Sequence, residues 1–413
     1  MKTMRALASL ITLAAAVPAA EIAPGLTLDG WVDTTFRVVN TPNYLPNATL
    51  PSGVIQVNPY SGSSPSTDFA SRAALTAGYT IAERVQANIG LWFNNDGSAV
   101  ELREASIVTD LGRGLAWQIG KTYNHLGWIA GDPTGLFRVN ESTIDYTGVF
   151  YGAVDPLGTS LAWTSPAEGF TAALFITNGF YNDKDGDNLT SIDNGSIQAK
   201  NDLGFGLDLI GRFGADQASE INLECAWDAH GGAQREGGKN GPKYQVGLNT
   251  TIKPAGEADP LTLGAEIIAL ATAYDDLDGN LARPGQTTRH EVGVMAMASY
   301  QVRQQSSWPM ALTGMYQRMD PYWDSTGPST WNSDGVALKD GRPYYHNDRV
   351  AVNEVSLGLL TNPFQDTAFA LNFELAYAFV DGGAANPAVH PVQPTDPRDG
   401  VTTVAIEVLA VIP

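Results

Sequence analysis

The sequence predicts an all-β fold: a closed, antiparallel, up-and-down transmembrane β-barrel of about 16 strands, within a range of roughly 14 to 18. Two observations predict it. Segments in which large apolar residues alternate with small or polar residues recur along the whole chain. The connections between these segments are alternately short and long. We therefore expect short turns at the periplasmic end of the barrel and long loops at the extracellular end.

The N-terminus, residues 1–20, is predicted to be a secretory signal peptide, which leaves 21–413 as a single barrel domain. Lys2 and Arg5 supply its positive charge. The apolar run from Leu7 to Val17 is too short to cross a bilayer as a helix, and small residues suited to cleavage follow it. The mature chain is therefore expected to be exported.

The composition excludes some partners and cross-links. Asp and Glu (44) outnumber Lys and Arg (24), which gives a formal charge of −20, and loss of Lys2 and Arg5 with the signal peptide makes the balance −22. Nucleic acid is not expected as a partner, because phosphate binding requires basic residues. Cys225 is the single cysteine, so no intrachain disulfide can form.

The predicted strands share a period of two, in which one face is large and apolar. In 367–380, for example, Phe369, Leu371 and Phe373 alternate with smaller residues, and Glu374 lies on the opposite face. An apolar band about 25 Å tall, crossed by tilted strands, needs about 10 residues per strand. The alternating segments lie at 26–38, 69–81, 84–93, 100–110, 115–121, 159–164, 170–180, 203–213, 220–227, 243–253, 261–274, 290–302, 308–319, 350–360, 367–380 and 402–412.

The connections set the order of these strands. Short joins rich in turn residues include 111–114 and 166–169, whereas 122–158 and 320–349 are long. This alternation is typical of a meander that closes on itself. A soluble sandwich, with Glu374, Glu266 and Asp208 on solvated faces, stays open as the alternative.

Three stretches carry a resemblance to a known family: "LDGWVDTTFRVVN", "DLGRGLAWQIGKTY" and "FTAALFITNGFYNDKDGDN". With the signal peptide, they resemble the OmpL-like outer-membrane β-barrel porins, over essentially the whole mature chain. The resemblance implies a passive pore without catalytic residues or cofactors. The partners it implies are small polar solutes, outer-membrane lipid and lipopolysaccharide, and other copies of the chain in a homo-oligomer. The chain ends at Pro413, whereas barrels of this class usually end in an aromatic residue that helps insertion.

The alternation also predicts which charged residues point into the barrel. Carboxylates predominate at mid-height, and basic residues lie near the ends. Charged walls that face each other across water give a pore selectivity, although any wet lumen needs polar residues. We expect a mild cation preference from the carboxylates, with an arginine wall favouring anions as the alternative. The inward basic residues are Arg37, Arg72 and Arg103 near the long-loop end and Arg84 near the short turns; the acidic residues are Asp33, Asp208, Glu224, Glu266, Glu374 and Glu407.

Loop 122–158 is the longest connection, and loops of about 37 residues are usually functional or disordered. It contains apolar residues such as Leu126 and Trp128, which an exposed loop would not need. We predict that it folds into the lumen as a constriction and brings one of three acidic residues toward the arginines. These are Asp132, Glu141 and Asp145. An outward loop packed on a neighbouring protomer is the alternative.

Two other patterns are weaker. Asp183, Asp185 and Asp187 resemble the first half of a calcium loop, but the glycine and glutamate of that motif are absent, so a polar loop without metal is the main interpretation. The five histidines show no metal-ligand spacing, and we expect each to be solvated.

Other function classes stay open. A sugar-specific channel would line its lumen with an aromatic track, of which inward Trp31 and Trp92 are a hint. A structural or adhesive surface barrel would use the loops 39–68 and 320–349. For a secreted hydrolase or membrane esterase, no arrangement of a nucleophile with its base is found in the sequence.

Overall fold

The structure is a computed structural model, and it describes fourteen stretches of the chain. The predicted signal peptide, apart from Ala20, lies outside them, as does Pro413. The described residues are 20–40, 66–93, 100–128, 155–165, 169–181, 192–193, 196–197, 203–229, 240–274, 286–302, 308–325, 350–363, 369–382 and 401–412.

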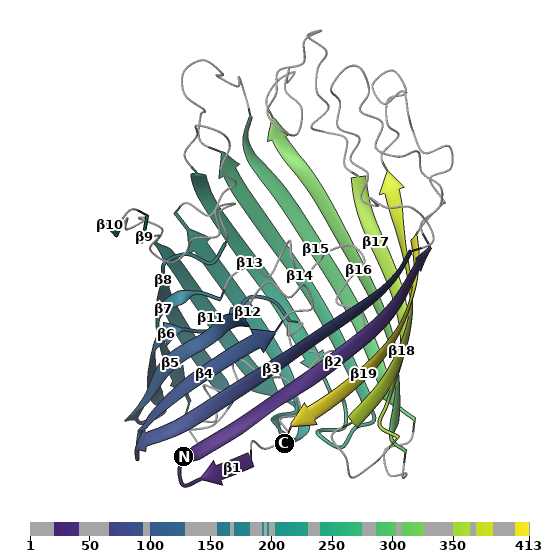
Figure 1. The fold of residues 1–413 in the computed structure, drawn as a ribbon. Coiled ribbons are helices and arrows are strands. Elements are labelled where there is room, and N and C mark those ends of the chain that lie inside the picture. Colours follow the sequence, from purple (N-terminus) through teal and green to yellow (C-terminus); the bar gives the residue numbers. More distant parts are fainter. Residues whose placement is uncertain are drawn as a thin grey trace.

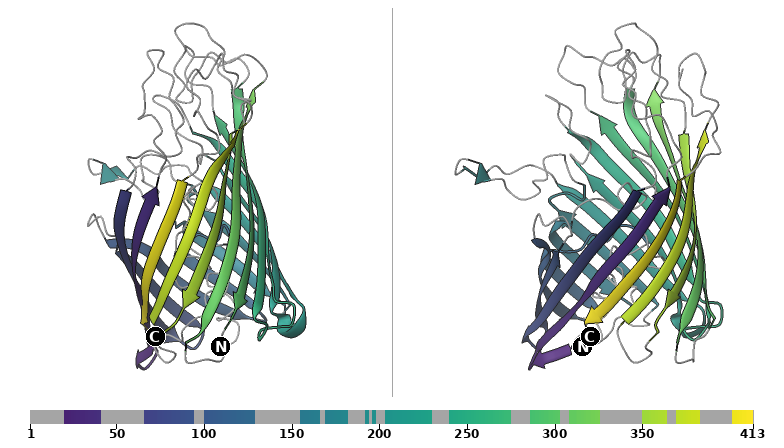
Figure 2. Two further views of the ribbon diagram at one scale, coloured as in Figure 1. Left: turned by 90° about the vertical axis from the view of Figure 1, so that its right-hand side faces the viewer. Right: turned by 45° about the vertical axis from the view of Figure 1, so that its right-hand side comes forward.

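Sixteen strands form one closed antiparallel barrel (Figures 1 and 2). Each strand pairs with the next one along the chain, β8 pairs directly with β11, and β19 pairs with β2 to close the sheet. The predicted fold class and strand number are confirmed. The strands are β2 (Leu26–Asn40), β3 (Ser66–Ala82), β4 (Val85–Phe93), β5 (Val100–Gly112), β6 (Leu115–Lys121), β7 (Leu157–Thr164), β8 (Phe170–Thr177), β11 (Gly204–Phe213), β12 (Ser219–Asp228), β13 (Asn240–Ile252), β14 (Leu261–Tyr274), β15 (Gln286–Gln301), β16 (Met310–Ser325), β17 (Val350–Thr361), β18 (Phe369–Gly382) and β19 (Val401–Ile412).

A few short elements lie outside the barrel sheet or extend it. β1 (Ala20–Ala23) pairs with the start of β2, and β9 (Ile192–Asp193) pairs with β10 (Ser196–Ile197). A single 3₁₀ turn, η2 (Ala215–Gln217), joins β11 to β12. In the described stretches, no helix has the length and apolar character needed to cross a membrane.

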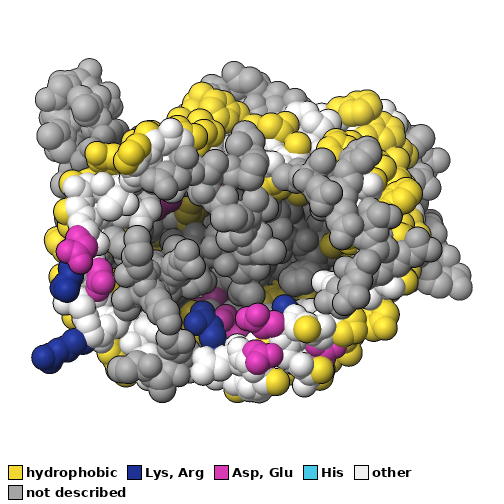
Figure 3. Space-filling view, turned by 90° about the horizontal axis from the view of Figure 1, so that it is seen from below, with side chains coloured by type: hydrophobic (Ala, Val, Ile, Leu, Met, Phe, Trp, Pro, Cys, Tyr) yellow, Lys and Arg dark blue, Asp and Glu magenta, His cyan; other side chains and the backbone are white. Residues whose placement is uncertain are grey.

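The two faces of the wall differ as the alternation predicts. On β18, the inward residues Glu374, Ala376 and Ala378 are buried, whereas the outward Leu375 is 48% exposed. Leu357 on β17 is 62% exposed, although it is one of the largest apolar side chains of its strand. Seen along the barrel, hydrophobic side chains cover the outer wall around a central hollow (Figure 3). The apolar surface is therefore on the outside of the sheet.

A β-bulge interrupts the regular register between β4 and β5. Gly90 pairs with Glu104 and Leu91 pairs with Leu102, so Arg103 is an extra residue on β5. A bulge of this kind re-aims a side chain and bends the strand locally. It brings the guanidinium of Arg103 over the ring of Trp92, 4.2 Å from the centroid.

Candidate functional site

The six predicted acidic residues all lie on the inner face of the wall, and each is at most 4% exposed. Such burial shows that other parts of the protein fill the space beside them. For three of these residues, that part is the beginning of the longest loop. Asp208, Glu224 and Glu266 come from β11, β12 and β14, and all three face residues 125–128.

Residues 122–128, which we call the inward segment, lie inside the barrel against these strands. The backbone N–H of Gly127 donates to both oxygens of Glu224, at 2.8 and 2.9 Å. The N–H of Trp128 donates to Oε1 of Glu266 at 2.9 Å, and its indole N–H donates to Oγ1 of Thr251 at 2.8 Å. Leu126 and Trp128 are buried in one apolar cluster with inner-wall residues. The carboxylates therefore hold the inward segment instead of facing open water.

Glycines on the inner wall make room for the inward segment. A Cβ on Gly264 would lie 2.1 Å from Cη2 of Trp128, and a Cβ on Gly206 would lie 3.0 Å from Cε1 of His125. The contact at Gly264 is sterically forbidden and the one at Gly206 is tight, so a side chain at Gly264 would displace the indole. Glycine in a strand often marks a position where another part of the protein approaches closely.

His125 is buried, and the expectation that it is solvated is wrong. Its ring stacks on Phe175, with centroids 3.9 Å apart, and meets the edge of Phe180 at 5.1 Å. Its Nε2 lies 3.5 Å from Oδ1 of Asp208. Burial lowers the pKa of His125 to about 3, because the charged ring would lose its hydration among aromatic neighbours.

Both ends of the long loop are tied together. The N–H of Thr122 donates to the carbonyl of Pro156 at 3.0 Å, and the N–H of Asn124 donates to Oδ1 of Asp155 at 3.2 Å. Asp155 also forms an ion pair with Arg103. Burial raises the pKa of Asp155, although the nearby Arg103 charge opposes the shift. The long loop thus reaches the arginine group through Asp155, a residue that the sequence analysis did not select.

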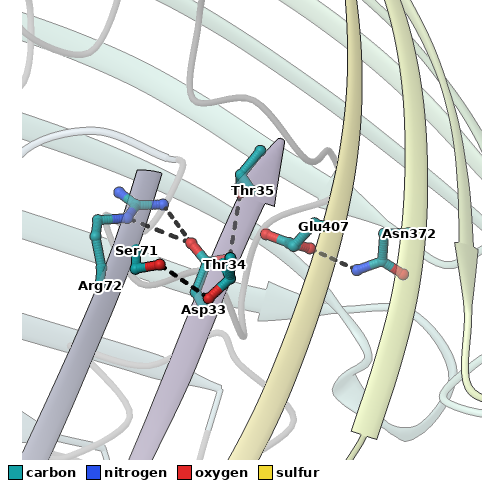
Figure 4. Close-up of polar contacts among 7 residues, drawn as sticks. All are labelled: Asp33, Thr34, Thr35, Ser71, Arg72, Asn372 and Glu407. Carbon is teal, nitrogen blue, oxygen red and sulfur yellow. Dashed lines mark hydrogen bonds and ion pairs between the residues drawn. The ribbon is translucent and has the colours of Figure 1, made fainter. Parts of the chain in front are cut away.

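The predicted basic residues near the long-loop end are all paired. Arg37 Nη2 lies 2.7 Å from Asp68 Oδ2, and Arg72 Nη2 lies 3.0 Å from Asp33 Oδ2. Figure 4 shows the second pair beside Glu407, whose Oε2 accepts a 2.6 Å hydrogen bond from Asn372. Arg84 lies in the exposed turn between β3 and β4.

The remaining candidates lie outside the described residues. They are Asp132, Glu141 and Asp145 of the long loop and the calcium-like Asp183, Asp185 and Asp187. Within the described stretches, no group of three or more His, Cys, Asp or Glu side chains is arranged to hold a metal ion.

Comparison with known proteins shows a shared fold. No family model matches the chain, and no curated protein does. OprB of Pseudomonas putida is 12% identical, with 93% of this chain and 94% of that chain covered and a TM-score of 0.53. OmpT of Vibrio cholerae, an outer membrane protein in its trimer form, is 11% identical over 94% and 100% of the two chains, with a TM-score of 0.52. The outer membrane channel DcaP of Acinetobacter baumannii is 10% identical over 95% and 99%, with a TM-score of 0.51.

We predict that Gly264→Val releases the inward segment. The new side chain would collide with Trp128, so the hydrogen bonds to Thr251 and Glu266 would be lost. Release is measured as thiol labelling of a Leu126→Cys reporter in a Cys225→Ser background, and labelling should become several-fold faster. Gly314→Val is the matched control, because a Cβ there meets only Leu357 at 3.7 Å. Equal labelling rates for the Gly264 and Gly314 variants would show that the glycine is not needed.

We also predict that the folded barrel loses stability as the pH falls from about 6.5 toward about 3. The pKa of His125 is lowered from 6.5 to about 3 in the folded protein, so unfolding takes up a proton in this window. The stability that depends on the neutral His125 ring is fully present above pH 6.5, and it decreases as the pH falls toward 3. The measurement is the thermal midpoint in detergent against pH. A His125→Phe variant should lose this part of the slope, and an unchanged slope would contradict the assignment.

Proposed function

We propose that this protein is a porin of the bacterial outer membrane, a water-filled channel for passive diffusion of small polar solutes and ions. The main support is the closed barrel, whose outer wall is apolar and whose inner wall carries many polar residues beside one apolar cluster. A closed sheet leaves no backbone edge unpaired in lipid, and the alternation suits lipid outside and water inside. A 16-stranded barrel has an interior wide enough for an aqueous channel.

The inward segment supports a pore of restricted width. It crosses the inner faces of β11 to β14 and occupies space that a wide channel would leave to water. The long loop therefore acts as the constriction in this proposal. The short turns would face the periplasm, and the long loops would face the cell exterior.

A sugar-specific channel is the second candidate, and the inner aromatic residues do not favour it. Trp31 and Trp92 pack edge to face, with centroids 5.3 Å apart. Both are at most 8% exposed, and Arg103 covers the ring of Trp92. An aromatic track must present ring faces to the solute, so this pair serves packing better than sugar binding.

Purified protein should form ion-conducting channels in planar bilayers. It should also fractionate with the outer membrane and migrate in a heat-modifiable way on detergent gels. Deleting residues 126–138 should raise the single-channel conductance, because the constriction would be removed. Recovery as a soluble periplasmic monomer without conductance would refute the porin proposal, and unchanged conductance after the deletion would refute the constriction.

We further propose a mild cation preference. The arginines Arg37, Arg72 and Arg103 each pair with a carboxylate, so they leave little positive charge to attract anions. Glu374 adds negative charge on the inner face of β18. Charges that are shielded from bulk salt act over a longer range than exposed ones.

The zero-current potential across a potassium chloride gradient tests this preference. We expect a potential whose sign indicates potassium selectivity, and Glu374→Gln should move that potential toward zero. Arg212→Gln, at a turn end, is the control and should move it much less. A chloride preference that disappears in the triple variant Arg37→Gln, Arg72→Gln, Arg103→Gln would assign selectivity to the arginines instead.

We extend the proposal to a homo-oligomer. The support is the likeness in fold to OmpT of Vibrio cholerae, which is described in a trimer form. Light scattering in mild detergent, with the detergent mass subtracted, gives the number of copies.

A further inference from the structure

A second connection also turns into the barrel where it begins. Residues 178–181, which we call the second segment, follow β8 at the start of the connection to β11. Phe180 and Tyr181 are large aromatic residues at the long-loop end, yet they are only 0% and 3% exposed. They belong to the same buried cluster as Leu126 and Trp128 of the inward segment. Two separate connections therefore meet inside the lumen.

Asp228, the last residue of β12, holds the second segment by its backbone. Its Oδ2 accepts hydrogen bonds from the N–H of Phe180 at 2.9 Å and from the N–H of Tyr181 at 3.3 Å. Glu224, on the same inner face of β12, accepts the N–H of Gly127 in a similar way. Two carboxylates of one strand therefore anchor two different connections.

The aromatic side chains add contacts to the inner wall and to the inward segment. Oη of Tyr181 donates to Oε1 of Gln245 on β13 at 2.9 Å. Nζ of Lys243 lies 4.0 Å from the centroid of the Tyr181 ring, a favourable cation–π distance. The rings of Phe180 and His125 meet edge to face, with centroids 5.1 Å apart. The second segment is therefore tied both to the wall and to the first connection.

Two glycines permit this close fit. Gly179 has a φ of 122°, which favours glycine, and a Cβ there would lie 2.8 Å from Oδ2 of Asp228. A Cβ on Gly206 of β11 would lie 2.9 Å from Cζ of Phe180. Glycine in a strand often marks a position where another part of the protein approaches closely. The backbone of the second segment can therefore reach Asp228 only because residue 179 has no side chain.

We propose that the second segment is a second arm of the constriction and that Asp228 is the residue that positions it. This proposal rests on the proposed porin function. β12 runs from the short turn at η2 to its end at Asp228, so the second segment lies on the long-loop side of the inward segment. The two arms narrow the pore at successive depths, and the contact between Phe180 and His125 joins them.

The width of the pore tests the second arm. It is measured as single-channel conductance and as the size of the largest polyethylene glycol that enters. Asp228→Ala and Gly179→Ala should each raise both values, because the second segment would lose its anchor or its close fit. Glu257→Ala, in an exposed turn, and Gly314→Ala, where a Cβ meets only Leu357 at 3.7 Å, are the matched controls and should behave like wild type. Unchanged width in both test variants would overturn the proposal.

A deletion background separates the two arms. In the protein that lacks residues 126–138, Asp228→Ala should raise the conductance further, since the second segment narrows the pore by itself. Absence of any further rise would show that Asp228 acts only through the inward segment, and the second arm would then be refuted. Heat-modifiable migration confirms that each variant is folded.

Thiol labelling tests the anchor without any conductance. A Phe180→Cys reporter in the Cys225→Ser background should react slowly. Asp228→Ala should make this labelling about tenfold faster, since hydrogen bonds to a carboxylate would be lost. Equal labelling rates with Asp228→Ala and Glu257→Ala would contradict the role of Asp228. If the protein forms no channels, the porin proposal fails, whereas the labelling still decides whether Asp228 anchors the second segment.

Discussion

The pairing of β19 with β2 is the constraint on which the rest of the molecule depends. Each of the other barrel pairings joins a strand to the next barrel strand along the chain. The β19–β2 pairing instead joins the last barrel strand to the first. On its inner side, polar contacts lie next to it: Arg72 of β3 pairs with Asp33 of β2, and Asn372 of β18 donates to Glu407 of β19 (Figure 4). Without closure, β2 and β19 would each expose a row of unpaired backbone N–H and C=O groups. In the proposed membrane location, lipid tails could not form hydrogen bonds with them.

Closure also divides one sequence pattern into two environments. Because side chains alternate between the two faces of a strand, Leu375 lies outside and Glu374 lies inside. The inner wall then needs partners for its buried carboxylates, because unpaired charge away from water is costly. The N–H groups of Gly127 and Trp128 supply those partners for Glu224 and Glu266. The backbone N–H groups of the inward segment and the side chains of Glu224 and Glu266 therefore meet each other's need for hydrogen-bond partners.

The strands were predictable because alternation is a local property. The strand number, the inward direction of Glu374 and the inward position of the first residues of the long loop all follow from short stretches of sequence and from loop length. The partners within the lumen were not predictable. Trp128 and Glu266 are 138 positions apart, and nothing local links them. His125 was expected in water for the same reason, since its aromatic neighbours come from β8 and the residues that follow it.

In the proposed pore, the double use of the carboxylates would couple the polarity of the lumen to its shape. Replacing Glu224 or Glu266 would change the polarity of the lumen and also weaken the hold on the inward segment, so a change in selectivity there would have two causes. Glu374 lies on the inner face of β18, whereas the side-chain acceptors that hold Gly127 and Trp128 come from β12, β13 and β14. A substitution at Glu374 therefore tests the charge of the proposed pore with those hydrogen bonds left in place.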